Sequence, residues 1–319
     1  MARRPLSSAD KVIASLALGG WGAFIAWFAM STHPQQLAKD FSYPWRAARA
    51  LLDGHDPYQV IQAVGAYPFN AKLFYPLPAA IAVMPLAPLP PAAAGALFMG
   101  ISSALLALGL LRERPHQLWV FASAPFWHAA VLGQWSPLLT AAALFPLLQA
   151  LGAAKPTIGL VAWLHRPSRA GIIGGAVLVA ISLAILPAWP REWLAAAATT
   201  GKYRGPATTF AGAFLLLGLL RWRRPEGRLL VGLALVPQLP VFYDTLPLWL
   251  IPSTWKRAVL LTACSWIGYL RWFPSAASPQ QNEIAIPLAL ATIWLPALLL
   301  VLALPAREAP PAAAPPTED

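Results

Sequence analysis

Residues 12–30 read VIASLALGGWGAFIAWFAM, an apolar run near the start of a chain of 319 residues. A transmembrane helix needs roughly 17 to 25 consecutive, mostly apolar residues, and this run meets that length. Further apolar runs recur to the end of the chain, separated by short hydrophilic breaks. The pattern predicts an all-α, polytopic transmembrane bundle of about eight to ten helices.

The composition also indicates a membrane protein. Hydrophobic residues make up 58% of the chain and charged residues 11%, whereas soluble domains carry about 25% charged residues. The net charge of +11 raises the question of a nucleic-acid partner. However, the basic residues stand in short breaks between apolar runs, as in cytoplasmic loops. We therefore expect no nucleic-acid partner, insertion in the cytoplasmic (inner) membrane, and a cytoplasmic N-terminus.

The first long hydrophilic segment, residues 33–70, is expected on the extracytoplasmic side because the first helix crosses outward. Within it, Pro44 is suited to the first turn of a short helix. Apolar residues then recur at helical spacing up to Gly54, which is suited to end that helix. The pattern predicts a short amphipathic helix lying on the membrane surface.

The rest of the chain is interpreted as part of one membrane domain over residues 1–304. Prolines break several apolar runs, and membrane helices tolerate such breaks where they line a cavity. Two helices are expected to meet near Gly133-Gln134, and a second hydrophilic loop is expected at residues 190–206. The tail, residues 305–319, has nothing to bury and is expected to be disordered.

Asp40, in the first hydrophilic segment, is the leading candidate for a catalytic group. A carboxylate where a membrane span meets an extracytoplasmic loop can act as general base for a hydroxyl acceptor. The alternative is a solvated loop aspartate paired with Lys39 or Arg46. The residues alone leave both interpretations open, since loop carboxylates are common and only a minority are functional.

The segment from Asp40 to Tyr58 reads DFSYPWRAARALLDGHDPY. It resembles the opening signature of glycosyltransferase family 87, which are polytopic enzymes of the GT-C superfamily that include polyprenyl-phosphomannose-dependent α-mannosyltransferases. Shorter matches follow in the family's order, at Phe74-Tyr75-Pro76-Leu77, Gly133-Gln134, Lys155-Pro156 and Tyr243-Asp244. The chain is short for this family, and it lacks the usual hydrophilic loop between the Gly-Gln and Lys-Pro steps.

The resemblance implies a GT-C-like fold and an inverting transfer of a sugar, mannose or a related hexose or pentose. The donor is a polyprenyl-phosphate sugar, and the acceptor is a lipid or glycan on the extracytoplasmic side of the membrane. Asp40 then deprotonates the acceptor hydroxyl, and the leaving phosphate needs positive charge or hydrogen-bond donors nearby. The candidates for that second role are Lys155, Lys202, Arg204 and His128.

Each of the other candidates keeps a structural alternative. Lys155 lies in an apolar stretch, where an ammonium is costly and usually functional, or else it snorkels to the interface. His128 fits a hydrogen-bonded helix histidine equally well. Gln134 is suited to bind sugar or to bridge two helices. Tyr75 is suited to stack on a sugar or to anchor at the membrane interface. Asp244, beside Tyr243, is a secondary site candidate because a buried carboxylate there needs a partner or water.

Missing motifs exclude several other functions. The chain has no Walker-type Gly-Lys-Ser/Thr loop, no His-Glu-x-x-His helix and no Gly-x-Ser-x-Gly elbow. The single cysteine, Cys264, excludes an intrachain disulfide. No cofactor is expected; the sparse carboxylates disfavour a dedicated metal cage, although a requirement for a divalent metal stays open.

The rival interpretation is a non-enzymatic membrane protein: a transporter, a lipid-binding scaffold, or an inactive relative of the same fold. A transporter places its essential polar groups near the bilayer midplane. The enzyme instead places Asp40 at the outer rim, facing a cavity that is open to lipid.

Overall fold

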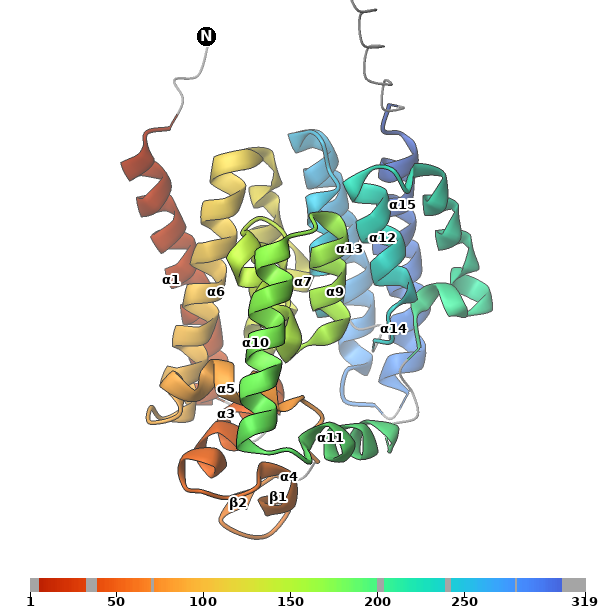
Figure 1. Ribbon diagram of the computed structural model, residues 1–319. Coiled ribbons are helices and arrows are strands. Elements are labelled where there is room, and N and C mark those ends of the chain that lie inside the picture. The colour runs from red at the N-terminus through yellow and green to blue at the C-terminus, as the bar shows by residue number, and fades with distance from the viewer. Residues whose placement is uncertain are drawn as a thin grey trace, which may run out of the picture.

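The protein is a helical bundle, and residues 39–69 form a small cap at one end of it (Figure 1). The computed structural model describes residues 6–32, 39–69, 72–199, 204–238, 242–278 and 280–305. Within these ranges the only strands are β1 (Ile61–Gln62) and β2 (Tyr67–Pro68), which pair in parallel in the cap. The all-α class predicted from the sequence is therefore confirmed.

The elements at the start of the chain are α1 (Ser8–Thr32), α3 (Lys39–Leu52), α4 (Pro57–Val60), α5 (Leu77–Val83), η1 (Met84–Leu86), α6 (Pro91–Glu113), η2 (Pro115–Ala122), α7 (Ala124–Leu132) and α8 (Ser136–Ala142). Those in the middle are η3 (Pro146–Ala154), α9 (Pro156–His165), α10 (Arg169–Ile185), α11 (Trp189–Ala198), η4 (Pro206–Thr208), η5 (Phe210–Arg221) and α12 (Pro225–Leu235). The last are η6 (Phe242–Leu250), α13 (Trp255–Trp272), η7 (Phe273–Ser275), α14 (Gln281–Ala289), η8 (Leu290–Trp294) and α15 (Leu295–Leu302).

Three uninterrupted helical segments have the length and composition to cross a membrane, which indicates a membrane protein. They are α1, α6 and the continuous segment Gln281–Leu302, and the bent pair of α10 and α11 makes a fourth if it counts as one span. The expected eight to ten helices of spanning length are therefore not present in the described residues. The remaining apolar runs are divided into shorter helices, many of which begin at a proline because proline cannot donate a backbone hydrogen bond.

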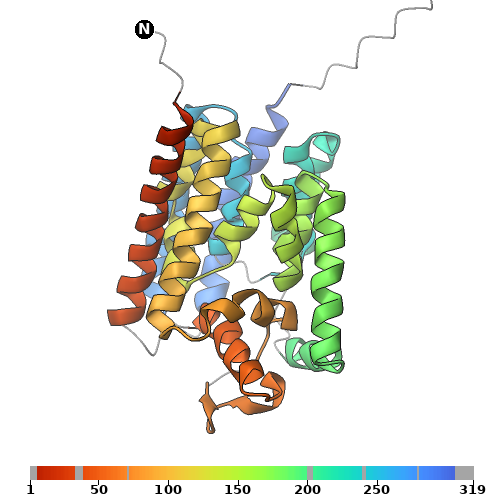
Figure 2. The same ribbon diagram turned by 60° about the vertical axis from the view of Figure 1, so that its left-hand side comes forward.

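Helices α1 and α6 lie side by side along their length (Figures 1 and 2). Small residues allow this close approach: a Cβ added at Gly19 would lie 2.9 Å from both the Ala104 Cβ and the Gly100 carbonyl oxygen. Small residues at a helix contact are typical of membrane helix pairs, in which packing drives association. The opposite face of α1 exposes large apolar side chains, including Phe24 and Phe28, and is suited to contact lipid.

The first polar segment differs from its predicted form. Helix α3 begins at Lys39 rather than at Pro44, so Asp40 lies in a first helical turn and not in a loop. Pro44 stays inside the helix, where its missing N–H removes the one helical bond to the Asp40 carbonyl. Gly54, with φ of +76°, ends the helix as predicted. Apart from Arg49 and Leu52, most of α3 is buried or half-buried against protein rather than lying as a free amphipathic helix.

The prediction of a second hydrophilic loop at residues 190–206 is also partly wrong. Its first half is helix α11, which runs from Trp189 to Ala198 and turns by 99° from α10. Pro190 at the first turn favours a helix start there. Burial of Trp189 and Ala196 explains why the segment does not stay a solvated loop.

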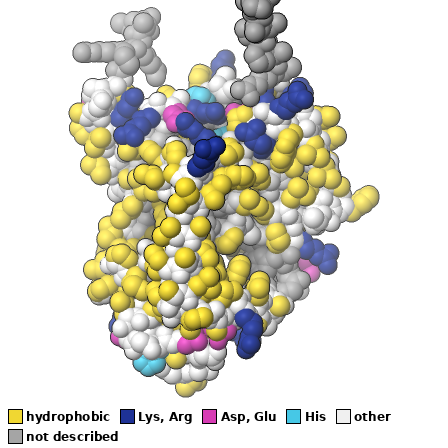
Figure 3. Space-filling model, viewed as in Figure 1, with side chains coloured by type: hydrophobic (Ala, Val, Ile, Leu, Met, Phe, Trp, Pro, Cys, Tyr) yellow, Lys and Arg dark blue, Asp and Glu magenta, His cyan; other side chains and the backbone are white. Residues whose placement is uncertain are grey.

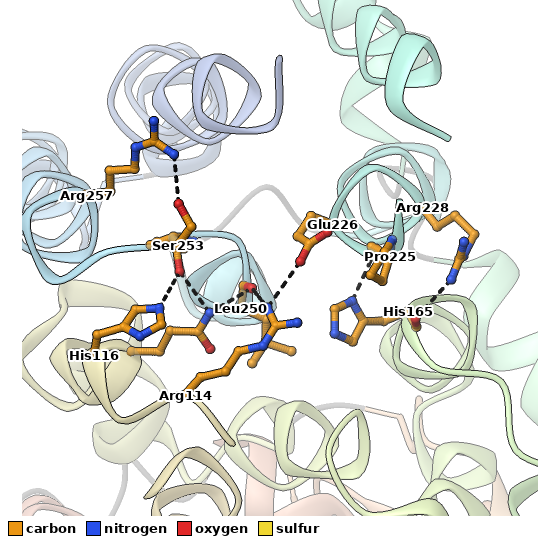
Figure 4. A network of polar contacts seen from close by, with 11 residues as sticks. Arg114, His116, His165, Pro225, Glu226, Arg228, Leu250, Ser253 and Arg257 are labelled. Carbon is orange, nitrogen blue, oxygen red and sulfur yellow. Dashed lines mark hydrogen bonds and ion pairs between the residues drawn. The ribbon is translucent and has the colours of Figure 1, made fainter. Parts of the chain in front are cut away.

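Basic residues gather at the end of the bundle where α1 begins and α15 ends, which we call the basic end (Figures 1 and 3). Arg114 forms an ion pair with Glu226 at 3.2 Å and donates to the Leu250 carbonyl at 3.1 Å, as Figure 4 shows. Arg228 donates to the Leu164 carbonyl at 2.8 Å, near the C-terminus of α9. Guanidinium groups at helix C-termini satisfy carbonyls that lack an intrahelical partner. The cap with α3, α4, β1, β2 and α11 lies at the opposite end, which we call the loop end.

Candidate active site

A cavity of about 1280 Å³ opens between the cap and the bundle, within the described residues. Residues from α3, from the segment just before α5, and from α7, α9, α11, η6, α13 and α14 contribute to its wall. The cavity is lined by six of the residues that the sequence predicted for the site: Asp40, Tyr75, His128, Gln134, Lys155 and Asp244. Residues that are distant in the chain therefore meet in one place.

Asp40 and Gln134 are brought together by a tight turn after α7. Gly133 ends α7 in the left-handed region, with φ of +65°. A Cβ added to Gly133 would lie 2.8 Å from the Phe41 Cβ, so glycine also lets α3 approach this turn. The Gln134 side-chain amide then donates a hydrogen bond from Nε2 to the Asp40 carboxylate. The predicted meeting of two helices near Gly133-Gln134 is confirmed, and Asp40 is a half-buried residue of helix α3 rather than part of a solvated loop.

Lys155 lies between η3 and α9, next to the proline that begins α9. Its Nζ donates to Asp244 Oδ1 at 2.7 Å and to Gln134 Oε1 at 3.3 Å. The side chains of Lys155 and Asp244 are only 17% and 5% exposed, so the ammonium does not snorkel to the surface. Asp244 has the partner that a buried carboxylate needs.

These contacts join Asp40, Gln134, Lys155 and Asp244 into one polar chain along the cavity wall. Because Nε2 donates to a carboxylate and Oε1 accepts from an ammonium, both ends of the Gln134 amide are fixed by charge. Gln134 therefore bridges two elements, as one of its two predicted roles required. An ammonium has three N–H donors, and two of those on Lys155 are used within the chain.

His128 faces the same cavity from α7 and is almost fully buried. Its ring centroid lies 5.2 Å from that of Tyr243 and 5.3 Å from that of Trp272. Nδ1 is buried with no hydrogen-bond partner among the described residues. Among the described residues, no protein hydrogen bond therefore supports the alternative of a satisfied helix histidine through Nδ1.

Tyr75 lines the cavity on the side of the cap, together with Tyr43 and Phe74. The ring of Tyr43 lies 5.8 Å from that of Phe74 and 5.9 Å from that of Tyr75, measured between centroids. The Tyr75 backbone is held in place because its carbonyl accepts a hydrogen bond from the Tyr58 hydroxyl at 2.9 Å. Burial raises the pKa of Tyr58, which keeps this donor neutral.

Helix α11 closes the cavity at the loop end. Its Trp193 lines the cavity and donates from Nε1 to the Phe74 carbonyl at 2.9 Å. Beside it, Gln59 in the cap donates to Glu192 at 2.9 Å. These two bonds connect α11 to the segment before α5 and to α4 at the cavity mouth.

Two predicted phosphate partners are not part of this arrangement. Arg204 is exposed and does not line the cavity; its carbonyl accepts from the Gln238 backbone N–H at 3.4 Å. Arg204 is therefore not brought to the cavity with the other predicted residues, and its role as a phosphate partner stays a prediction. Lys202 lies outside the described residues.

Sequence reasoning missed Trp272 and Trp193 as cavity residues. Trp272 is the last residue of α13, and nothing in its local pattern separates it from an interface tryptophan. Within the described part of the chain, no group of three or more His, Cys, Asp or Glu side chains could hold a metal ion. No protein-family model, curated protein or solved structure matches the chain.

Proposed function

We propose that this protein is an integral membrane glycosyltransferase that moves a sugar from a polyprenyl-phosphate donor to a lipid or glycan acceptor. The observation that carries the proposal is the polar chain in the cavity, Asp40–Gln134–Lys155–Asp244. Sugar transfer needs a base for the acceptor and a cation for the leaving phosphate. The polar chain supplies both groups, the carboxylate of Asp40 and the ammonium of Lys155, and the Gln134 amide lies between them.

In the proposed reaction, Asp40 takes the proton from the acceptor hydroxyl. The hydroxyl oxygen then forms a bond to the anomeric carbon while the bond from that carbon to the phosphate oxygen breaks. The electron pair of the broken bond leaves with the polyprenyl phosphate, and the anomeric configuration inverts. Gln134 acts as a positioning residue because its amide bonds the Asp40 carboxylate through Nε2 and is itself fixed by Lys155 through Oε1.

Lys155 is the proposed partner of the leaving phosphate. Its third N–H donor has no protein partner among the described residues, and Lys155 lines the cavity. A phosphate oxygen in the cavity can accept this bond without breaking the ion pair to Asp244. Because the ammonium lies in a largely buried site, its interaction with developing negative charge is stronger than in water.

The level of Asp40 along the bundle favours a transferase over a transporter. Its neighbour Phe41 packs beside Gly95, near the start of α6, and Gly95 itself contacts Met30, near the end of α1. The carboxylate is therefore close to the ends of two membrane-length helices rather than halfway along them. Transporters place their binding sites near the midplane.

The charge distribution supports the proposed orientation in a cytoplasmic membrane. Basic residues gather at one end, and under the positive-inside rule that end faces the cytoplasm. The cap and the cavity mouth lie at the other end and so face the extracytoplasmic side. A cavity of about 1280 Å³ exceeds the usual range of small-molecule pockets, roughly 300–1,000 Å³, and has room for parts of two substrates.

The purified chain in liposomes tests the proposed reaction class directly. The donors are labelled polyprenyl phosphates that carry mannose, glucose or arabinose, and a crude membrane lipid extract supplies the acceptors. We expect a labelled product and release of polyprenyl phosphate with one donor. Absence of transfer from every donor, with a well-folded protein and active extract controls, would favour the non-enzymatic alternatives.

A further inference from the structure

The cavity has two aromatic walls, one at each end of the polar chain. We call Tyr43, Phe74 and Tyr75 the cap wall, and His128, Tyr243 and Trp272 the bundle wall. The cap wall adjoins Asp40, because Tyr43 lies three residues later on the same helix, one turn away. The bundle wall adjoins the other end of the chain, because Tyr243 precedes Asp244 and its ring centroid lies 5.2 Å from Lys155 Nζ.

The two walls differ in their chemistry. The imidazole of His128 is part of the bundle wall, whereas the polar groups of the cap wall are phenols. Nδ1 of His128 is buried without a protein partner, and Nε2 makes no hydrogen bond to the described residues, so Nε2 is the ring nitrogen left to bond a ligand in the cavity. His128, Tyr243 and Trp272 line the cavity together, so the bundle wall offers an aromatic surface that also carries the hydrogen-bonding nitrogen of an imidazole. Such a surface suits a sugar ring, which combines an apolar face with hydroxyl groups at its rim.

The order of residues along the polar chain, from Asp40 to Asp244, indicates which substrate each wall binds. If Asp40 contacts the acceptor hydroxyl and Lys155 contacts the phosphate, the donor enters from the Lys155 end. We propose that the bundle wall binds the sugar ring of the donor, with His128 Nε2 bonding one of its hydroxyls, and that the cap wall binds the acceptor. This assignment rests on the proposed function and adds a division of the cavity into two subsites.

His128→Phe separates a binding role from a structural one. Phenylalanine keeps an aromatic ring among Tyr243 and Trp272 and removes a buried nitrogen that has no partner. A buried, unsatisfied polar atom destabilises a fold, so the variant should melt at the same temperature as the wild type or higher. A histidine that served only the fold would give a lower melting temperature instead.

The test is calorimetric titration of the full-length protein in detergent with two probes, farnesyl phosphate and farnesyl phosphomannose. We expect the wild type to bind the mannosylated lipid about tenfold more tightly, through one ring stack and one hydrogen bond. His128→Phe should reduce this preference to about twofold or less and leave the affinity for farnesyl phosphate unchanged. Tyr75→Leu, the matched control in the cap wall, should keep the wild-type preference.

The outcomes separate this assignment from the proposed function. A His128→Phe protein with the full preference for the mannosylated lipid, or a Tyr75→Leu protein that loses it, overturns the division into subsites alone. A wild-type protein that binds both probes equally, or binds neither, counts against the proposed donor and overturns both.

Discussion

Gln134 is the residue on which the site geometry most depends, because its one amide contacts both the carboxylate of Asp40 and the ammonium of Lys155. Gln134→Leu removes both hydrogen bonds at similar volume. We expect kcat to fall about 10- to 100-fold while KM for the donor changes little, because loss of positioning acts mainly on the transition state. A rise in KM at unchanged kcat would instead assign Gln134 to substrate binding.

The ion pair between Lys155 and Asp244 allows its role in stability to be separated from its role in the reaction. Asp244→Asn leaves the buried ammonium without a counter-charge, which should lower the free energy of unfolding by about 3 kcal/mol. The double variant Lys155→Met, Asp244→Leu removes both charges and should recover most of that loss. Thermal unfolding in detergent measures stability, and the transfer assay measures activity. Recovery of both stability and transfer in the double variant would exclude Lys155 from the reaction.

At the scale of elements, the turn after α7 sets the position of α3 and therefore of Asp40. Gly133→Ala should lower stability by about 1–2 kcal/mol, because alanine is strained at positive φ, and should also displace Phe41. Gly54→Ala is the matched control: its φ is also positive, at +76°, but no atom lies within 4 Å of the added Cβ.

We expect both glycine variants to lose stability, and only Gly133→Ala to lose most of its sugar-transfer activity. Circular dichroism melts and the transfer assay measure the two effects on the same preparations. Equal activity in Gly133→Ala and Gly54→Ala would show that the approach of α3 to this turn does not set the position of the base.

The sequence predicted those helix ends that are determined by residues at the helix end itself. Gly54 ends α3, and Gly133 separates two helices. The start of α3 and the helical form of α11 were not predictable in this way. Both depend on apolar faces that are buried against partners far along the chain.

In the candidate site too, the sequence identified individual residues but not the contacts between them. Dipeptides such as Lys155-Pro156 and Tyr243-Asp244 marked residues worth testing, but sequence spacing gave no indication that Lys155 and Asp244 pair. Arg204 had the right charge and lies outside the cavity, whereas Trp272 had no distinguishing signal and lines it. In each case, the three-dimensional fold determines which residues lie together in the cavity.

At the scale of the whole molecule, the proposed orientation places the cap and the basic end on opposite sides of the membrane. A Cys264→Ser background removes the one native thiol. New cysteines at the exposed positions Asp53 and Arg223 then report the two ends. In intact cells, a membrane-impermeant maleimide should label Asp53→Cys, and Arg223→Cys only after the membrane is opened. The reverse pattern would contradict the proposed orientation.

The central claim, that Asp40 is the base of a sugar transfer, is tested most directly by comparing two aspartate variants in the liposome assay. Asp40→Asn keeps the size of the side chain and removes its basicity. Asp53→Asn makes the same change at an exposed position outside the cavity, where the Tyr67 hydroxyl bonds the side chain. We predict that Asp40→Asn lowers kcat by about 100- to 10,000-fold, the usual contribution of a general base, and that Asp53→Asn keeps the wild-type rate. Transfer by a folded Asp40→Asn protein at the wild-type rate would contradict the account.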